Sequence, residues 1–329
     1  MTHSDGPIPP SPPAPEVTKG DVMPRRSADL PLFLLVTFAL SWLAALPVWL
    51  ADAPIGSPLF TVVGIVLMFT PTFGVLAVWL YGRRRGEPGT SPREWVRRTG
   101  LTLGDRRGRT LGLVATAWLG VPVLTIVAIA LSAALGLLSV DLDGLSLFRQ
   151  GLLRAGQEQA AQPDPTIMAL IQGVTIFLIA PLINSIAAFG EEWGWRGWLL
   201  PRLMPLGTWR ALLASGVIWG AWHAPLTLRG YNYPELGAWA APMFVIFCVA
   251  FGSLLGWLRL RSGSVWPAVV GHGALNASAG LVVLVGDAAA PPNLVVAGIT
   301  GLVGSALIAV LTAALFRLRP VTAPAPVAV

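Results

Sequence analysis

The sequence is poor in the residues on which soluble enzymes usually depend. Of its 329 residues, 12% are charged and one is a cysteine. Cys248 therefore cannot form a disulfide within the chain, and a cluster of thiolate metal ligands is excluded. The GxSxG elbow of serine hydrolases and the HExxH motif of zinc proteases are also missing. A serine or cysteine nucleophile is thus disfavoured.

Apolar residues dominate what is present. They make up 54% of the chain, and the mean hydropathy is +0.69. This composition predicts an all-α protein, a polytopic bundle of transmembrane helices. A span needs about 20 predominantly apolar residues. Eight stretches meet that requirement, at about 30–51, 59–81, 110–139, 166–190, 211–229, 239–258, 264–286 and 293–316.

The spans form one predicted helical domain, residues 30–319, between two tails. Residues 1–29 are rich in proline and are predicted to be disordered, as are residues 320–329. No small-residue cleavage site follows the first apolar stretch. That stretch is therefore interpreted as a membrane span and not as a signal peptide.

The basic residues segregate to one side of this topology. Lys19 is the only lysine, so arginines carry the net charge of +6. With both termini in the cytoplasm, every basic residue except Arg149, Arg154 and Arg229 falls on the inner side, as the positive-inside rule requires. The membrane topology thus explains the surplus of basic residues. We therefore expect membrane lipids as partners and no nucleic acid. The preference for arginine and alanine indicates a GC-rich genome and hence a bacterial cytoplasmic membrane.

Two further patterns concern packing. Small residues recur four apart, a spacing that lets helix backbones approach closely in lipid. They predict tight packing within the bundle at Gly216 and Gly220, Gly252 and Gly256, and Ala297, Gly301 and Ser305. Tryptophans 193, 195 and 198 are expected to form an interfacial belt, or alternatively to line a substrate groove.

Polar side chains lie within or beside three of the apolar stretches. Ionisable groups at membrane depth are costly, and they usually mark a functional site. Glu192 and Arg196 are four residues apart and can pair on one helix face, which leaves Glu191 to face neighbouring helices. Pro225 is expected to open the helix near the histidine of its stretch. The predicted site, on the cytoplasmic side, comprises Glu191, Glu192, Arg196, His223, His272 and Asn276.

This residue set supports two kinds of hydrolysis. A carboxylate and an imidazole can together deprotonate a water, while a second imidazole and an amide donate hydrogen bonds to an oxyanion. Alternatively, Glu191, His223 and His272 could bind a divalent metal such as Zn²⁺ and leave one position open for water. In that case Glu192 would be the base. The residues do not decide between these alternatives.

At these positions the sequence resembles the CPBP (CAAX protease and bacteriocin-processing, or ABI) family of intramembrane proteases, which includes the type II CAAX prenyl endopeptidases. The family pattern consists of EExxxR, FxxxH and HxxxN. These motifs correspond here to Glu191–Arg196, Trp219–His223 and His272–Asn276, with Trp219 in place of the usual phenylalanine. The resemblance covers roughly residues 166–286.

The resemblance implies a helical membrane metalloprotease or glutamate-dependent protease. It implies that Glu191 and His223 activate water, and that His272 and Asn276 stabilise the oxyanion. Glu192 and Arg196 would then order the site.

The leading hypothesis is an intramembrane endopeptidase that cleaves a membrane-associated or lipidated substrate. The first alternative is a proton- or ion-coupled transporter that uses Glu191 and the histidines as a relay. The second is a non-catalytic membrane scaffold or immunity protein.

Overall fold

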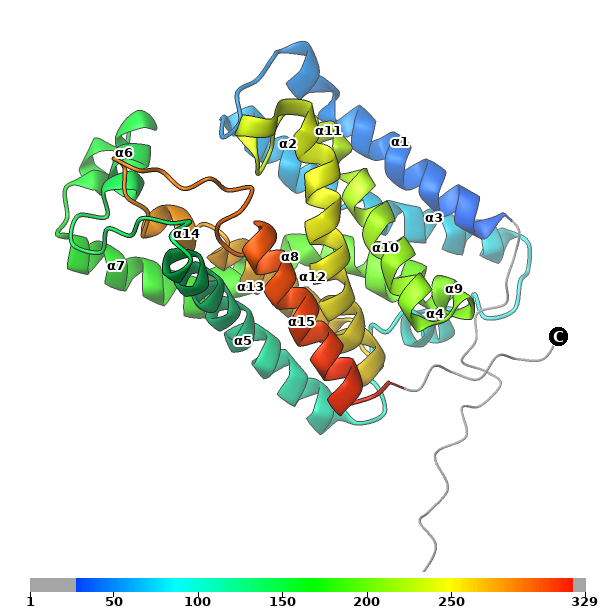
Figure 1. The fold of residues 1–329 in the computed structure, drawn as a ribbon. Coiled ribbons are helices and arrows are strands. Elements are labelled where there is room, and N and C mark those ends of the chain that lie inside the picture. The colour runs from blue at the N-terminus through cyan, green and yellow to red at the C-terminus, as the bar shows by residue number, and fades with distance from the viewer. Residues whose placement is uncertain (1–27, 322–329) are drawn as a thin grey trace, which may run out of the picture.

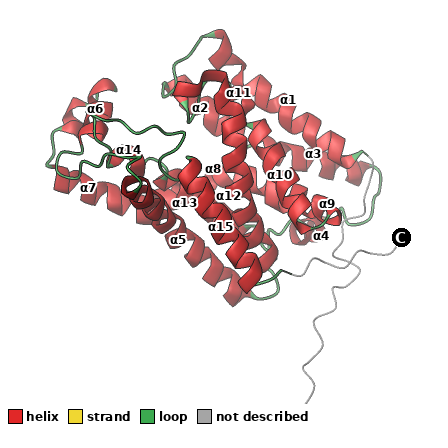
Figure 2. Ribbon diagram, in the orientation of Figure 1, coloured by secondary structure: helices red, strands yellow, loops and turns green. Residues whose placement is uncertain are grey.

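The computed structural model describes residues 28–321. Within this range the chain forms helices joined by loops, and these residues contain no β-strand (Figure 2). An isolated antiparallel bridge pairs Val140 with Gly286. The predicted all-α class is therefore confirmed. The tails predicted at 1–29 and 320–329 fall almost entirely outside the described residues.

The first half of the chain supplies three long passes, which are blue to green in Figure 1. The second pass is one helix with a break at Phe69, and a short helix follows it. A cap of short helices lies beyond the third pass. The elements are α1 (Asp29–Leu50), α2 (Pro58–Met68), α3 (Thr70–Arg84), α4 (Pro92–Arg98), α5 (Arg107–Ala134), α6 (Ser146–Arg154) and η1 (Glu158–Ala161).

The second half supplies five more passes. The fourth is a compound helix in which π-helical and 3₁₀ segments interrupt the α-helix: α7 (Pro165–Val174), η2 (Thr175–Ile179), α8 (Ala180–Glu192), η3 (Trp193–Leu199), α9 (Leu200–Leu203) and η4 (Met204–Leu206). The remaining elements are α10 (Thr208–Trp222), α11 (Ala224–Thr227), η5 (Pro234–Trp239), α12 (Ala240–Ser262), α13 (Trp266–Ser278), α14 (Leu281–Leu284) and α15 (Leu302–Leu318).

Six of these passes are long and apolar enough to cross a membrane, judged by length and composition over the described residues. The passes formed by α10 and α15 are shorter, with 15 and 17 residues. The chain is thus a polytopic helical bundle. Six spans and one shorter apolar helix, α15, are found among the described residues, and the predicted number of about eight spans stays a prediction. The fifth prediction ran to residue 229, but α10 ends at Trp222 and Pro225 lies in the first turn of α11. This break confirms the expected effect of the proline.

The predicted eighth span, 293–316, is wrong in its first third. Residues 293–301 are not helical, and α15 begins only at Leu302. Gly298 has φ +80°, in the left-handed region that side chains rarely adopt, and Pro291 and Pro292 precede the segment. The expected helical ladder of Ala297, Gly301 and Ser305 therefore does not exist.

Most of the described arginines lie in α4 and α9 or at the ends of α3, α5, α10, α12 and α15. These elements meet along the lower right side of the bundle in Figure 1. Contacts join the helix ends there: Arg202 of α9 pairs with Asp29 of α1, and the Trp257 indole of α12 donates to the Arg319 carbonyl after α15. At the opposite end, Arg229 pairs with Asp52 at 2.7 Å. We call the first of these the arginine-rich end.

The helices α10 and α12 approach each other through glycines. A Cβ atom on Gly216 would lie 2.6 Å from the Val249 Cα, and one on Gly220 would lie 2.7 Å from the Val245 Cα. Both contacts are with the backbone of α12, so the neighbour cannot move aside. The small residues in these two helices therefore pack within the bundle, as predicted from their spacing.

We expect Gly216→Ala to destabilise the protein by about 1–3 kcal/mol relative to Gly120→Ala, because the added methyl group overpacks the contact between α10 and α12. Gly120 lies in α5, and a Cβ atom on it would have no neighbour within 4 Å. Thermal unfolding of the two variants in the same detergent measures the difference. Equal melting temperatures would contradict the close approach.

Candidate functional site

Three passes carry the polar residues singled out in the sequence. Glu191 and Glu192 end α8, His223 is the residue after α10, and His272 lies in the middle of α13. The prediction placed the carboxylates just beyond the end of a span at residue 190. Instead the helix continues to Leu206, so both carboxylates are deep in the bundle. Arg196, expected at the inner side beyond the end of that span, is 1% exposed for the same reason.

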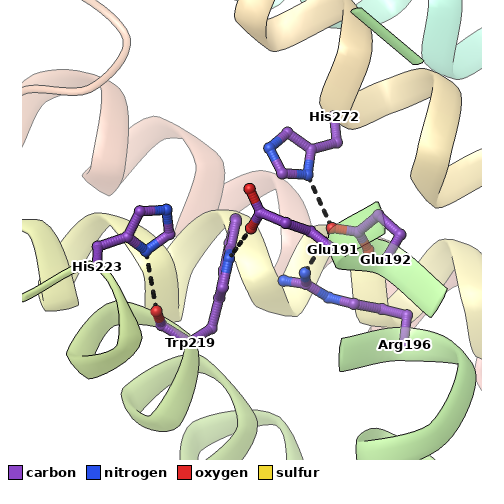
Figure 3. A network of polar contacts seen from close by, with 6 residues as sticks. All are labelled: Glu191, Glu192, Arg196, Trp219, His223 and His272. Carbon is purple, nitrogen blue, oxygen red and sulfur yellow. Dashed lines mark hydrogen bonds and ion pairs between the residues drawn. The ribbon is translucent and has the colours of Figure 1, made fainter. Parts of the chain in front are cut away.

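The carboxylate of Glu192 joins two of these passes. Its Oε1 accepts a hydrogen bond from Arg196 Nη1 at 2.7 Å and lies 2.9 Å from His272 Nδ1 (Figure 3). All three side chains are buried. This confirms the predicted pairing of Glu192 with Arg196. It also shows that Glu192 orients His272, because the contact leaves the other ring nitrogen of that histidine, Nε2, free to face the site.

Close helix packing allows this contact across passes. A Cβ atom on Gly273, the residue after His272, would lie 2.6 Å from Ser185 Oγ and 2.7 Å from the Pro181 carbonyl oxygen. Glycine thus lets α13 lie directly against α8. The imidazole can therefore reach a carboxylate at the end of α8.

The carboxylate of Glu191 has a different partner. Its Oε2 accepts a hydrogen bond of 2.6 Å from the Trp219 indole Nε1, and its side chain is directed into the space between the two histidines (Figure 3). Glu191 is 2% exposed. Sequence reasoning treated Trp219 only as an aromatic substitute for phenylalanine. Its N–H group, which phenylalanine lacks, is the signal that could have identified it as a site residue.

His223 is held by the backbone of its own helix. Its Nδ1 lies 2.9 Å from the Trp219 carbonyl oxygen, one turn earlier. If Nδ1 carries the proton, that carbonyl accepts its hydrogen bond and Nε2 is left as a base. This second nitrogen points toward the Glu191 carboxylate, without a direct hydrogen bond between the two side chains (Figure 3). His223 is only partly buried, unlike the other members of the network.

Aromatic rings enclose the polar groups. The Arg196 guanidinium carbon lies 4.2 Å from the Trp219 ring centroid, and the His223 ring packs edge-on against Trp222 and Phe244. Such surroundings limit the access of bulk water and strengthen the electrostatic contacts inside them.

Two of the three tryptophans that follow the glutamates do not lie in an interfacial belt. Trp195 and Trp198 are fully buried, and Trp198 stacks on Phe33 of α1 at 4.6 Å between ring centroids. The prediction failed for these two because the predicted span ended at residue 190, before them. In the structure the helix continues, and α1 covers this part of it.

The π-helical geometry after Glu192 is supported by donors from other helices. In a π-helix the hydrogen bonds run from i to i+5, and such segments are often found at functional sites. The carbonyl of Gly190 accepts a hydrogen bond from Thr72 Oγ1 at 2.8 Å, and that of Arg196 accepts one from Arg259 Nε at 3.1 Å. Side chains of α3 and α12 therefore hold the segment that carries Arg196.

Asn276 follows His272 by one turn of α13, but its side chain is exposed. Among the described residues, no hydrogen bond joins its amide to the polar network. The structure thus brings together five of the six residues predicted from the sequence. The role that the family pattern assigns to Asn276, stabilisation of the oxyanion, stays a prediction.

Glu191, His223 and His272, the predicted metal ligands, do not form a metal-binding group in the described structure. Among residues 28–321, no group of three His, Cys, Asp or Glu side chains is arranged to hold a metal ion. One oxygen of Glu191 accepts from an indole N–H, and Glu192 accepts from a guanidinium and lies against an imidazole. These contacts do not favour a metal, and the zinc site stays a prediction.

Comparison with known proteins found a family match for one segment of the chain. A family model described as type II CAAX prenyl endopeptidase Rce1-like matches residues 166–278, about a third of the chain. The matched segment contains all three motifs, and it confirms the resemblance inferred from them. A search of curated proteins found no match.

We expect Arg196→Met to destabilise the protein by about 3–5 kcal/mol, because it leaves a buried carboxylate without its cationic partner. The double variant Glu192→Gln/Arg196→Met removes both charges and should recover much of this loss. Thermal unfolding in detergent measures both effects. If the single variant were as stable as the double variant, the ion pair would not stabilise the bundle.

Proposed function

We propose, from the match to type II CAAX prenyl endopeptidases, that this chain is an intramembrane endopeptidase that acts on a membrane-associated or lipidated substrate. One observation carries the proposal. Two glutamates and two histidines from three passes meet in a buried, aromatic-lined site, and one carboxylate and one imidazole are directed toward each other without a direct bond.

In the proposed reaction, a water molecule bridges the Glu191 carboxylate and Nε2 of His223. Glu191 takes a proton from this water as its oxygen attacks the carbonyl carbon of the scissile peptide bond. The carbonyl π electrons move to oxygen, which gives a tetrahedral intermediate. The intermediate then expels the amine, and the proton held by Glu191 passes to the leaving nitrogen. The products are an amine and a carboxylic acid, which then loses its proton to solvent.

The oxyanion needs hydrogen-bond donors. His272 fits this task because Glu192 holds its Nδ1, and the protonated ring can then donate through Nε2. We assign the second donor to Asn276 from the family pattern. Since the Asn276 amide is exposed, a bound substrate would have to draw it toward the site. Glu192 and Arg196 act by ordering the imidazole.

The proposed mechanism is glutamate-dependent, and no step is routed through a metal. This choice rests on the arrangement of the side chains, which does not form a set of metal ligands among the described residues.

We further propose that the arginine-rich end faces the cytoplasm of a bacterial cell. The segregation of most described arginines to one set of helix ends supports this orientation. Substrates would then be proteins that present a cleavage site near the cytoplasmic leaflet, and lipidated tails would be anchored there.

We expect Glu191→Ala and His223→Ala each to lower proteolysis by at least about 100-fold, the usual contribution of general acid–base catalysis. Comparative membrane proteomics of wild-type and Glu191→Ala cells first identifies fragments that vanish, and purified protein in liposomes then measures their cleavage. Glu235→Gln, an exposed carboxylate beyond α11, serves as the matched control. Full proteolysis by a folded Glu191→Ala protein would refute the proposal. Ion flux that ceased in Glu191→Gln would indicate a transporter instead.

We expect proteolysis to survive exhaustive dialysis against a chelator, because the side chains do not form a ligand set. The measurement compares the cleavage rate before and after dialysis, together with the metal content of the sample. A loss of activity that Zn²⁺ restores would establish the metal-dependent alternative.

A further inference from the structure

The position that carries phenylalanine in the family pattern is occupied here by Trp219, and its indole and backbone contact both water-activating residues. We propose that Trp219 is a positioning residue: its indole N–H fixes the orientation of the Glu191 carboxylate, and its carbonyl fixes the ring of His223. This inference rests on the proposed function and concerns only how the water-activating pair is held.

A short hydrogen bond joins the Trp219 indole to the Glu191 carboxylate. Trp219 Nε1 lies 2.6 Å from Glu191 Oε2, and both side chains are 2% exposed. A hydrogen bond to a charged acceptor in such surroundings is short and strong. It ties one carboxylate oxygen and thereby directs the other oxygen toward the histidines. A phenyl ring cannot make this bond.

Neighbouring side chains hold the Trp219 indole ring in one orientation. The Arg196 guanidinium lies over its face at 4.2 Å from the centroid, the His272 ring packs edge-on at 5.4 Å, and the Phe251 ring lies at 6.4 Å. On the α12 side, a Cβ atom on Gly252 would lie 3.4 Å from Trp219 Cε3. The donor is therefore held in one orientation before substrate binds.

Trp219 contacts both members of the proposed water-activating pair. The Trp219 carbonyl lies 2.9 Å from His223 Nδ1, while its indole holds Glu191. The two groups proposed to share a water are thus set by the backbone and side chain of the same residue. Removing the indole N–H should change the orientation of the carboxylate and leave the histidine contact intact.

Helix α3 offers a matched control. Trp79 is partly buried, and its Nε1 donates to the Thr90 carbonyl at 2.9 Å, away from the polar network. Trp79→Phe therefore removes the same atoms and one indole hydrogen bond, as Trp219→Phe does. A purely structural role for Trp219 predicts similar effects of the two substitutions on activity.

The test uses the full chain in membranes. Fragments that vanish in Glu191→Ala cells are quantified in Trp219→Phe and Trp79→Phe cells, and their cleavage is then measured with purified proteins. We expect Trp219→Phe to lower kcat by about 10- to 100-fold, in line with the loss of a hydrogen bond to a charged group. KM should stay within about twofold, and Trp79→Phe should retain kcat. Equal kcat values in the two variants would overturn the positioning role while leaving the proposed protease intact.

A spectroscopic measurement does not depend on turnover. Ultraviolet resonance Raman bands that report indole N–H hydrogen bonding should differ between the wild type and Glu191→Ala, because the acceptor of one tryptophan is removed. Identical spectra would overturn the inference even if Trp219→Phe failed to fold. By contrast, unchanged fragments in Glu191→Ala cells would overturn the proposed function itself.

Discussion

The burial of the Glu192 carboxylate is the constraint on which the rest of the site depends. A carboxylate taken out of water costs several kcal/mol unless charged or polar partners surround it. Glu192 has an arginine from its own helix and a histidine from α13, and both contacts are under 3 Å. The pair with Arg196 offsets the desolvation of both charges. The contact with His272 couples this ion pair to the packing of a second pass.

Close helix approach is what makes these contacts possible. Glycines at 216 and 220 bring α10 against the backbone of α12, and Gly273 brings α13 against α8. At this spacing Trp219 lies between Arg196 and both histidines, where it contacts all of them. The carbonyls of Gly190 in α8 and Arg196 in the π-helical segment accept hydrogen bonds from side chains of α3 and α12, so two other helices hold the segment that carries the site. The polar network therefore depends on the same close helix packing that forms the apolar core.

Sequence patterns succeeded where a local rule decides the outcome and failed where neighbouring helices do. Spacing of four residues predicted the pair of Glu192 and Arg196, because helix geometry alone places them together. It could not show that Trp198 is buried, since that depends on α1 covering this part of the compound helix. The prediction of a helix in the segment before α15 was wrong for another reason. Its composition is apolar, but Gly298 adopts a left-handed conformation that interrupts a helix.

The sequence by itself determined that the chain crosses a membrane several times, that its arginines gather at one end, and that three motifs supply the polar residues. Each follows from composition or from spacing along a single helix. Only the tertiary structure decided which carboxylate meets which partner: Glu192 lies against His272, Glu191 accepts from Trp219, and Asn276 is outside the network. These pairings depend on the distances between separate passes, which packing sets and which no local pattern encodes.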